Sequence, residues 1–229
     1  MRVVIAGAHG KIGMRLGRRL AERGDAVVGV VRNPAHAGDL SAIGVEPVVL
    51  DLEAASVDDV AAVLAGADAV VFSAGAGPGS GVARKDTVDR AAAVLLADAA
   101  ERAGVRRYLL VSSIGVEGVR GHTTGPDDVV GVGGGETSTV FHAYLVAKLA
   151  AEDDVRARPL DWTILRPGRL TDDAGTGRVL LAPDAARGAV PRDDVAAVLV
   201  ALLDRPATSG LVLTLVGGDT PVEDAVAAV

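Results

Sequence analysis

The chain has 229 residues, and 49% of them are hydrophobic, which is enough for one α/β domain with a sizeable core. Its formal net charge is -7, so the basic surface expected of a nucleic-acid-binding protein is not indicated. It contains no cysteine, which excludes disulfides, thiol nucleophiles and cysteine-bound metals. The longest apolar run, residues 195–203, is about half the length that crosses a bilayer. We therefore expect a cytoplasmic protein that binds neither nucleic acid nor membrane.

Short β-branched or apolar runs alternate with amphipathic segments of helical length along the chain. The expected strands are residues 2–6, 26–31, 46–50, 69–73, 108–112, 161–166 and 211–216. The expected helices are residues 14–23, 57–64, 88–103, 141–158, 193–203 and 222–229. Such alternation predicts one α/β domain over residues 1–229, built on a doubly wound parallel sheet with helices on both faces.

Three further segments are expected to form a substrate pocket. Residues 75–81 and 115–140 are glycine-rich, and residues 169–181 begin the small C-terminal part of the domain. Residues 75–81 follow the fourth strand, at the carboxyl edge of the sheet where ligands of open α/β sheets bind. An irregular stretch as long as residues 115–140 is usually functional in a compact domain.

Residues 7–13 form a glycine loop between the first strand and the first helix. In this context the glycines allow a tight turn, a close approach of pyrophosphate and tight packing of helix on strand. The N-terminus of the helix then faces the phosphates. The loop therefore predicts a dinucleotide-binding site, formed by Gly7, His9, Gly10, Lys11, Ile12 and Gly13.

Arg32 follows the second strand, where an NAD-binding protein usually places Asp or Glu. A guanidinium can pair with a 2′-phosphate and stack on adenine, so NADP(H) is favoured over NAD(H). A solvated surface arginine is the alternative interpretation. Lys11 could add a second positive charge, or could simply extend into solvent.

Several motifs together resemble the short-chain dehydrogenase/reductase superfamily, which has a Rossmann fold. They are the glycine spacing, Asp51-Leu52 after the third strand, Ser73-Ala74-Gly75 after the fourth, and Ser112-Ser113 after the fifth. Residues 162–171 (WTILRPGRLT) and 190–196 (VPRDDVA) are most similar to atypical members labelled NAD(P)-binding or epimerase/dehydratase proteins.

The resemblance implies roles for seven of these residues in binding the cofactor. Asp51 and Leu52 would contact adenine, and the backbone of Pro167 and Gly168 would meet the nicotinamide. The three residues that would line the ribose are Ser73, Ala74 and Gly75. From the residues alone, Asp51 could instead cap a helix or turn, and Ser73 could cap a strand end.

Tyr144 and Lys148 are four residues apart in an expected helix, so both project from one face. A nearby ammonium favours the phenolate and brings the tyrosine into range for proton transfer at neutral pH. In the superfamily this lysine also binds the nicotinamide ribose, and a serine polarises the carbonyl. We expect Ser113 to be that serine, with Ser112 as the alternative. Tyr144 could instead be a packed, half-buried tyrosine.

The leading hypothesis is an NADP-dependent oxidoreductase that moves hydride between the nicotinamide and a small carbonyl or alcohol, with Tyr144 exchanging the proton. The alternatives are a redox sensor that binds NADP(H) without turnover, and a sugar-type epimerase or dehydratase. Motifs of α/β-hydrolases, phosphate-loop ATPases and zinc proteases are not found. Paired acids are interpreted as turns and caps, so no metal is expected. A monomer or small homo-oligomer is expected.

Overall fold

The computed structural model describes residues 1–77, 79–120 and 136–229, and its centre is a nine-stranded sheet. The strand order is β11-β8-β10-β6-β5-β4-β1-β2-β3. Its strands are β1 (Arg2–Ala6), β2 (Ala26–Val31), β3 (Glu46–Val49), β4 (Ala69–Phe72), β5 (Arg107–Val111), β6 (Asp161–Pro167), β8 (Arg178–Ala182), β10 (Leu211–Gly217) and β11 (Thr220–Pro221). A two-stranded sheet joins β7 (Arg169–Thr171) to β9 (Ala189–Pro191).

The strand order reverses at β1, which pairs in parallel with β2 on one side and β4 on the other. Val3 lies opposite Val27 in one neighbour and opposite Ala69 in the other. All pairings from β3 across to β10 are parallel, whereas β8 and β11 close one edge with antiparallel pairings. A reversal of this kind places the ligand-binding crevice beyond the carboxyl ends of β1 and β4.

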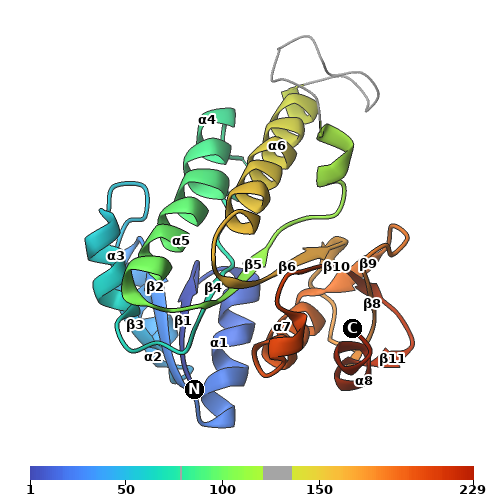
Figure 1. Ribbon diagram of the computed structural model, residues 1–229, viewed down its shortest axis with the longest axis horizontal. Coiled ribbons are helices and arrows are strands. Elements are labelled where there is room, and N and C mark those ends of the chain that lie inside the picture. The colour runs from blue at the N-terminus through green and yellow to red at the C-terminus, as the bar shows by residue number, and fades with distance from the viewer. Residues whose placement is uncertain (78, 121–135) are drawn as a thin grey trace.

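Helices cover both faces of the sheet (Figure 1). One face packs against α1 (Lys11–Arg23), α2 (Ala37–Ser41), α7 (Arg192–Leu203) and α8 (Val222–Ala227). The other packs against α3 (Val57–Leu64), α5 (Ala92–Ala103) and α6 (Glu136–Arg156). Two apolar clusters, one on each face, form the core. The central strands are buried on both faces, as parallel strands are, and therefore appear in the sequence as continuous apolar runs.

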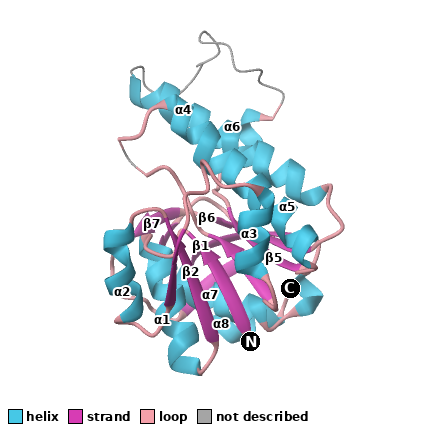
Figure 2. Ribbon diagram, turned by 90° about the vertical axis from the view of Figure 1, so that its left-hand side faces the viewer, coloured by secondary structure: helices cyan, strands magenta, loops and turns pink. Residues whose placement is uncertain are grey.

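Residues 82–103 form one helical rod with an irregular beginning. The rod starts with α4 (Val82–Arg84), continues through the π-helical segment η2 (Lys85–Ala91) and ends as α5. The views in Figures 1 and 2 place α4 next to the beginning of α6, beyond the strand ends. Short helical turns also occur at η1 (Pro34–His36), η3 (Val116–Val119) and η4 (Pro206–Thr208).

The predicted doubly wound fold is confirmed, and the differences concern boundaries and short elements. The helix expected at 88–103 begins six residues earlier, with α4, and the helix expected at 141–158 begins at Glu136, inside the segment expected to be a loop. The strands β7, β8, β9 and β11 were not predicted, because runs of two to five residues are too short to establish a period of two. Among the described helices, none is long and apolar enough to span a membrane.

Candidate functional site

The glycine loop connects β1 to α1 and packs tightly against the end of β4. Gly7 has φ +79°, and a Cβ placed there would lie 2.6 Å from the Cα of Ala74. A Cβ on Gly13 would lie 2.4 Å from the carbonyl oxygen of Gly7. Both positions therefore need glycine, the first for the turn and the second for the packing of helix on strand.

The N-terminus of α1 is suited to an anion. Gly10 is the N-cap and offers no side-chain acceptor, and the first turn carries no acidic residue. The first backbone N–H groups of a helix have no partner within the helix, and the helix dipole favours negative charge there. This terminus therefore fits the pyrophosphate of a dinucleotide.

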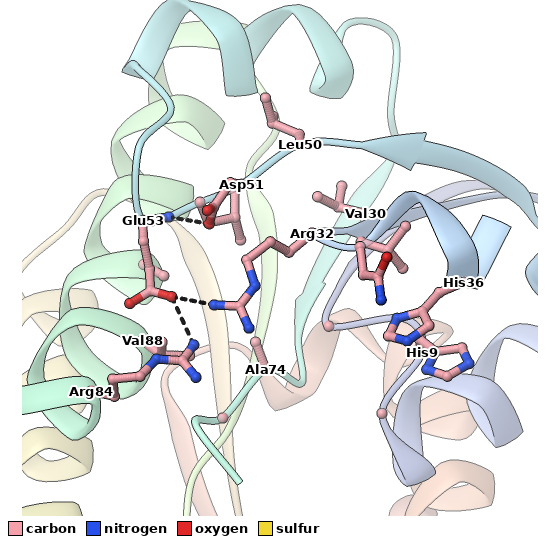
Figure 3. Close-up of a pocket in the computed structure, with 17 residues that line it drawn as sticks. His9, Val30, Arg32, His36, Leu50, Asp51, Glu53, Ala74, Arg84 and Val88 are labelled. Carbon is pink, nitrogen blue, oxygen red and sulfur yellow. Dashed lines mark hydrogen bonds and ion pairs between the residues drawn. The ribbon is translucent and has the colours of Figure 1, made fainter. Parts of the chain in front are cut away.

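A cavity of about 330 Å³, the Arg32 cavity, lies beyond the ends of β1, β2 and β3 (Figure 3). Its walls include backbone of the glycine loop and apolar side chains such as Val30 and Leu50. Eight residues predicted to bind the cofactor line it: Gly7, His9, Gly10, Arg32, Asp51, Leu52, Ala74 and Gly75.

Glu53 links two arginines in this cavity, as Figure 3 shows. Its Oε2 accepts hydrogen bonds of 2.7 Å from both Arg32 and Arg84, and its Oε1 accepts one of 2.6 Å from Thr87. Hydrogen bonds from Arg84 and Thr87 lower the pKa of Glu53, so the carboxylate stays ionised. Sequence reasoning missed both Glu53 and Arg84. Arg84 lies outside the helix that was expected to begin at residue 88.

His9 and Asp51, which also line this cavity, have partners within the chain. The Nε2 of His9 lies 2.8 Å from the Oδ2 of Asp39, and its ring stacks on His36 with centroids 3.7 Å apart. The Oδ1 of Asp51 accepts a 3.0 Å hydrogen bond from the backbone N–H of Glu53, so this side chain caps a turn as well as lining the cavity.

A second cavity of about 1010 Å³, the Tyr144 cavity, opens between the strand ends, η2 and α6. Tyr144, Lys148, Ile12 and Ser73 line it. Ala74 and Gly75 line both cavities, so the two hollows meet at the end of β4. One extended ligand could therefore reach from Arg32 to Tyr144.

Lys148 is buried and held by three partners. Its Nζ donates to the carbonyl oxygens of Ala74 at 3.3 Å and Val111 at 3.1 Å, and lies 3.4 Å from the Oδ1 of Asp89. Asp89 is fully buried, and its Oδ2 accepts a 3.2 Å hydrogen bond from the N–H of Ala76. Asp89 is a site residue that the sequence did not reveal, because an acid in an amphipathic helix is usually solvated.

Tyr144 is half-buried and lies close to two ammonium groups. The Nζ atoms of Lys148 and Lys85 are 5.9 Å and 5.6 Å from the centroid of its ring. The ring of Phe141 stacks on that of Tyr144, with ring centroids 6.0 Å apart. Two cations at this distance are attracted to the electron-rich face of the ring.

The two candidate serines have different surroundings. Ser112 is buried and lines the Tyr144 cavity, and its Oγ has no hydrogen-bond partner among the described residues. Ser113 does not line the cavity, and its Oγ donates to the carbonyl oxygen of Ile114 at 3.2 Å. A buried hydroxyl without a partner is costly, which suits a group that a ligand completes. Ser73, in contrast, donates to the carbonyl oxygen of Ala6 at 3.1 Å.

Four residues predicted to bind the cofactor line neither cavity. Lys11 pairs with Asp172 at the surface, and Gly13 packs against the glycine loop. Pro167 ends β6, and a Cβ on Gly168 would lie 2.3 Å from the carbonyl oxygen of Gly188. Packing against Gly188 therefore explains why residue 168 is a glycine.

The three expected pocket segments contribute unequally. Residues 75–81 provide Gly75, Gly77, Gly79, Ser80 and Gly81 to the Tyr144 cavity. Residues 169–181 provide Leu170, and residues 115–140 provide Thr139 and Val140, while residues 121–135 lie outside the described part of the chain. Within the described ranges, no group of three or more His, Asp or Glu side chains could hold a metal ion.

A buried ion pair fixes α6 to the sheet next to the site. Glu152 follows Lys148 by one turn and is fully buried. It accepts hydrogen bonds from Arg166 on β6, at 2.9 Å to Nε and 2.5 Å to Nη2. Arg166 also donates to Glu117 at 2.6 Å, and hydrogen bonds from Arg120 and Arg166 lower the pKa of Glu117 to about 2.

Comparison with known proteins agrees with this geometry. A family described as NAD(P)H-binding matches residues 7–206. The chain is 34% identical over 226 residues to a Bacillus subtilis protein named as an uncharacterised sugar epimerase, and covers 98% of each chain.

Solved structures extend the likeness to the whole fold. A Bacillus halodurans protein provisionally assigned as an NAD-dependent epimerase/dehydratase superposes with a TM-score of 0.86 at 33% identity, covering 100% of both chains. An anaerobillin reductase from Escherichia coli O157:H7 superposes with a TM-score of 0.77 at 27% identity, covering 96% of this chain and 98% of the other. The chain therefore belongs to the NAD(P)H-binding family, a group of Rossmann-fold proteins of the oxidoreductase and epimerase type related to atypical short-chain dehydrogenases/reductases.

Proposed function

We propose that the protein is an NADP-dependent oxidoreductase that transfers hydride between the nicotinamide and a small carbonyl or alcohol. One observation carries this proposal: two cavities meet at Ala74 and Gly75, one containing Arg32 and the other containing Tyr144 and Lys148. A dinucleotide is a ligand with this extended shape, with an anionic end and a reactive end.

The residues present fit such a cofactor. Arg32 and Arg84 would hold the 2′-phosphate in place of Glu53, while Asp51 and Leu52 would border the adenine. The N-terminus of α1 would hold the pyrophosphate, and Lys148 would hold the nicotinamide ribose. When bound, the nicotinamide supplies or accepts the hydride.

Tyr144 would exchange a proton with the substrate oxygen through its phenol hydroxyl. Lys148 lies beside the Tyr144 ring, and Asp89, 3.4 Å from its Nζ, would help to hold that lysine in place. The buried hydroxyl of Ser112 would donate a hydrogen bond to the substrate carbonyl. On this geometry Ser112 supports the role better than Ser113.

An epimerase would use the same residues but would return the hydride to its own substrate. The names of two relatives favour this alternative. The apolar side chains of Val82, Val111, Phe141 and Leu170 in the Tyr144 cavity favour a substrate less polar than a sugar. Net oxidation of NADPH separates the two, because an epimerase consumes no cofactor.

The first test is calorimetric titration with NADPH and NADH, followed by NADPH absorbance across a panel of carbonyl compounds. We expect tighter binding of NADPH and its oxidation by at least one compound. Arg32→Asp is expected to weaken NADPH by at least about tenfold, since hydrogen bonds between charged groups contribute about 1.5–3 kcal/mol, and to change NADH little.

Each contrary outcome identifies a different error. Equal weakening of both cofactors by Arg32→Asp would contradict the 2′-phosphate assignment. NADPH binding without oxidation across the panel would favour a sensor over an enzyme. Conversion of a sugar without net change in NADPH would favour the epimerase.

A further inference from the structure

Lys85 is a buried cation in the Tyr144 cavity to which the proposed function assigns no role. It is 7% exposed, and its Nζ donates a 2.9 Å hydrogen bond to the carbonyl oxygen of Gly77. The same nitrogen lies 5.6 Å from the ring centroid of Tyr144. The ammonium is therefore held beside the group that would handle the substrate proton.

Lys85 differs from the cavity cations Arg32, Arg84 and Lys148, each of which has a carboxylate partner. Arg32 and Arg84 share Glu53, and Lys148 has Asp89. Within the described ranges, no carboxylate lies within 4.0 Å of Lys85. An ammonium removed from water without a counter-ion is unfavourable by several kcal/mol. An anionic ligand in the cavity would relieve that cost.

The position of Lys85 separates it from the cofactor phosphates. Arg84, the preceding residue, lines the Arg32 cavity, whereas Lys85 lines only the Tyr144 cavity. The pyrophosphate also has its own donors at the N-terminus of α1. The anion that Lys85 faces is thus expected to belong to the substrate.

We infer that the substrate carries a carboxylate on an apolar body, and that Lys85 binds this carboxylate while the carbonyl faces Tyr144. The inference rests on the proposed function for the carbonyl and extends it by the carboxylate. Val82, Val140, Phe141 and Leu170 supply apolar walls for the remainder of the substrate.

The test compares two probes of the same shape, 4-formylbenzoate and its methyl ester, by calorimetry on the protein saturated with NADP⁺. We expect the acid to bind at least about tenfold more tightly than the ester, as a charge-assisted hydrogen bond would give. Equal affinities, or no binding of either probe, would overturn the inference.

Variants then assign the preference to Lys85. Lys85→Met removes the charge but keeps most of the apolar side chain, and should abolish the preference for the acid, whereas Lys85→Arg should retain it. Arg90→Met is the matched control, because Arg90 is on the same segment, pairs with Asp86 and lines neither cavity. A preference unchanged in Lys85→Met would refute the assignment, and weaker NADPH binding in that variant would show that Lys85 holds the cofactor instead.

The readouts keep this inference separate from the proposed function. A preference for the acid that depends on Lys85, without NADPH oxidation on any aldehyde, would retain the anion site and reject the oxidoreductase. If the acid and the ester bind with equal affinity and both oxidise NADPH, the oxidoreductase is retained and the anion site is rejected.

Discussion

Ser112 and Ser113 are adjacent in sequence but face different surroundings. Residues that follow a strand alternate in direction, so only one of two neighbours can face the cavity at the strand end. The unpartnered Oγ of Ser112 is inside the Tyr144 cavity, and the Oγ of Ser113 is bonded to its neighbour's carbonyl. The resemblance to short-chain dehydrogenases identified the pair, but the choice within it required the backbone.

Ser112→Ala is expected to lower kcat by about 100-fold or more, the usual effect of losing one donor to a developing oxyanion. Ser113→Ala should stay near the wild-type rate, and Tyr144→Phe provides the reference for loss of the proton-transferring hydroxyl. Steady-state rates on the best carbonyl substrate measure all three. A larger effect at Ser113 than at Ser112 would support Ser113 as the serine that polarises the carbonyl, as expected from the sequence.

At the scale of elements, α6 carries Tyr144, Lys148 and Glu152 at successive intervals of four residues, so the three lie along one face. Glu152 binds Arg166 on β6 with two hydrogen bonds. The ion pair thereby fixes the position of the helix against the sheet. It also fixes the positions of Lys148, one turn before Glu152, and Tyr144, two turns before it.

Glu152→Ala is expected to destabilise the fold by about 3–5 kcal/mol, since it leaves the Arg166 charge buried without its main partner. The matched control is Asp153→Ala, whose carboxylate pairs with Arg120 at the surface and should change stability by less than about 1 kcal/mol. Urea unfolding measures both. Similar losses in the two variants would show that the buried pair does not hold the helix.

Sequence patterns predicted the elements that depend on local chemistry. The buried strands of the parallel sheet and the glycine loop could be identified, because continuous apolar runs and glycine spacing express their structure directly. The site roles of Arg84, Lys85 and Asp89 could not be predicted. The directions of these side chains depend on the π-helical segment, and the sequence of residues 85–91 contains no pattern that predicts a π-helix. Glu53 was missed because its partners come from two distant parts of the chain, Arg32 after β2 and Arg84 and Thr87 on the helical rod.

At the scale of the whole molecule, the two cavities lie at one rim of the sheet, and their walls come from segments far apart in the sequence. The Arg32 cavity draws on the glycine loop, β2, the loops after β3 and β4, and the helical rod of residues 82–103, and the Tyr144 cavity adds α6. A ligand that spans both would tie these segments together and stabilise the whole fold.

NADPH at about 100 times its Kd is expected to stabilise the folded state by about 2.7 kcal/mol. For a domain of this size such a gain raises Tm by about 5–11 °C. A thermal melt with and without the cofactor measures this, and 2′,5′-ADP should give a smaller shift because it reaches only the Arg32 cavity. An equal shift with both ligands would argue against occupation of the Tyr144 cavity by the nicotinamide half.

The π-helical segment η2 also has a consequence for how this site can change by insertion and deletion. Each residue of an α-helix turns the chain by about 100°, so loss of one residue from 85–91 would rotate α4 by roughly that angle about the axis of α5. Arg84 and Lys85 would swing away from the cavities, while the apolar face of α5 would stay in the core. A single codon gained or lost here would thus alter ligand choice and leave the packing of α5 in the core unaltered.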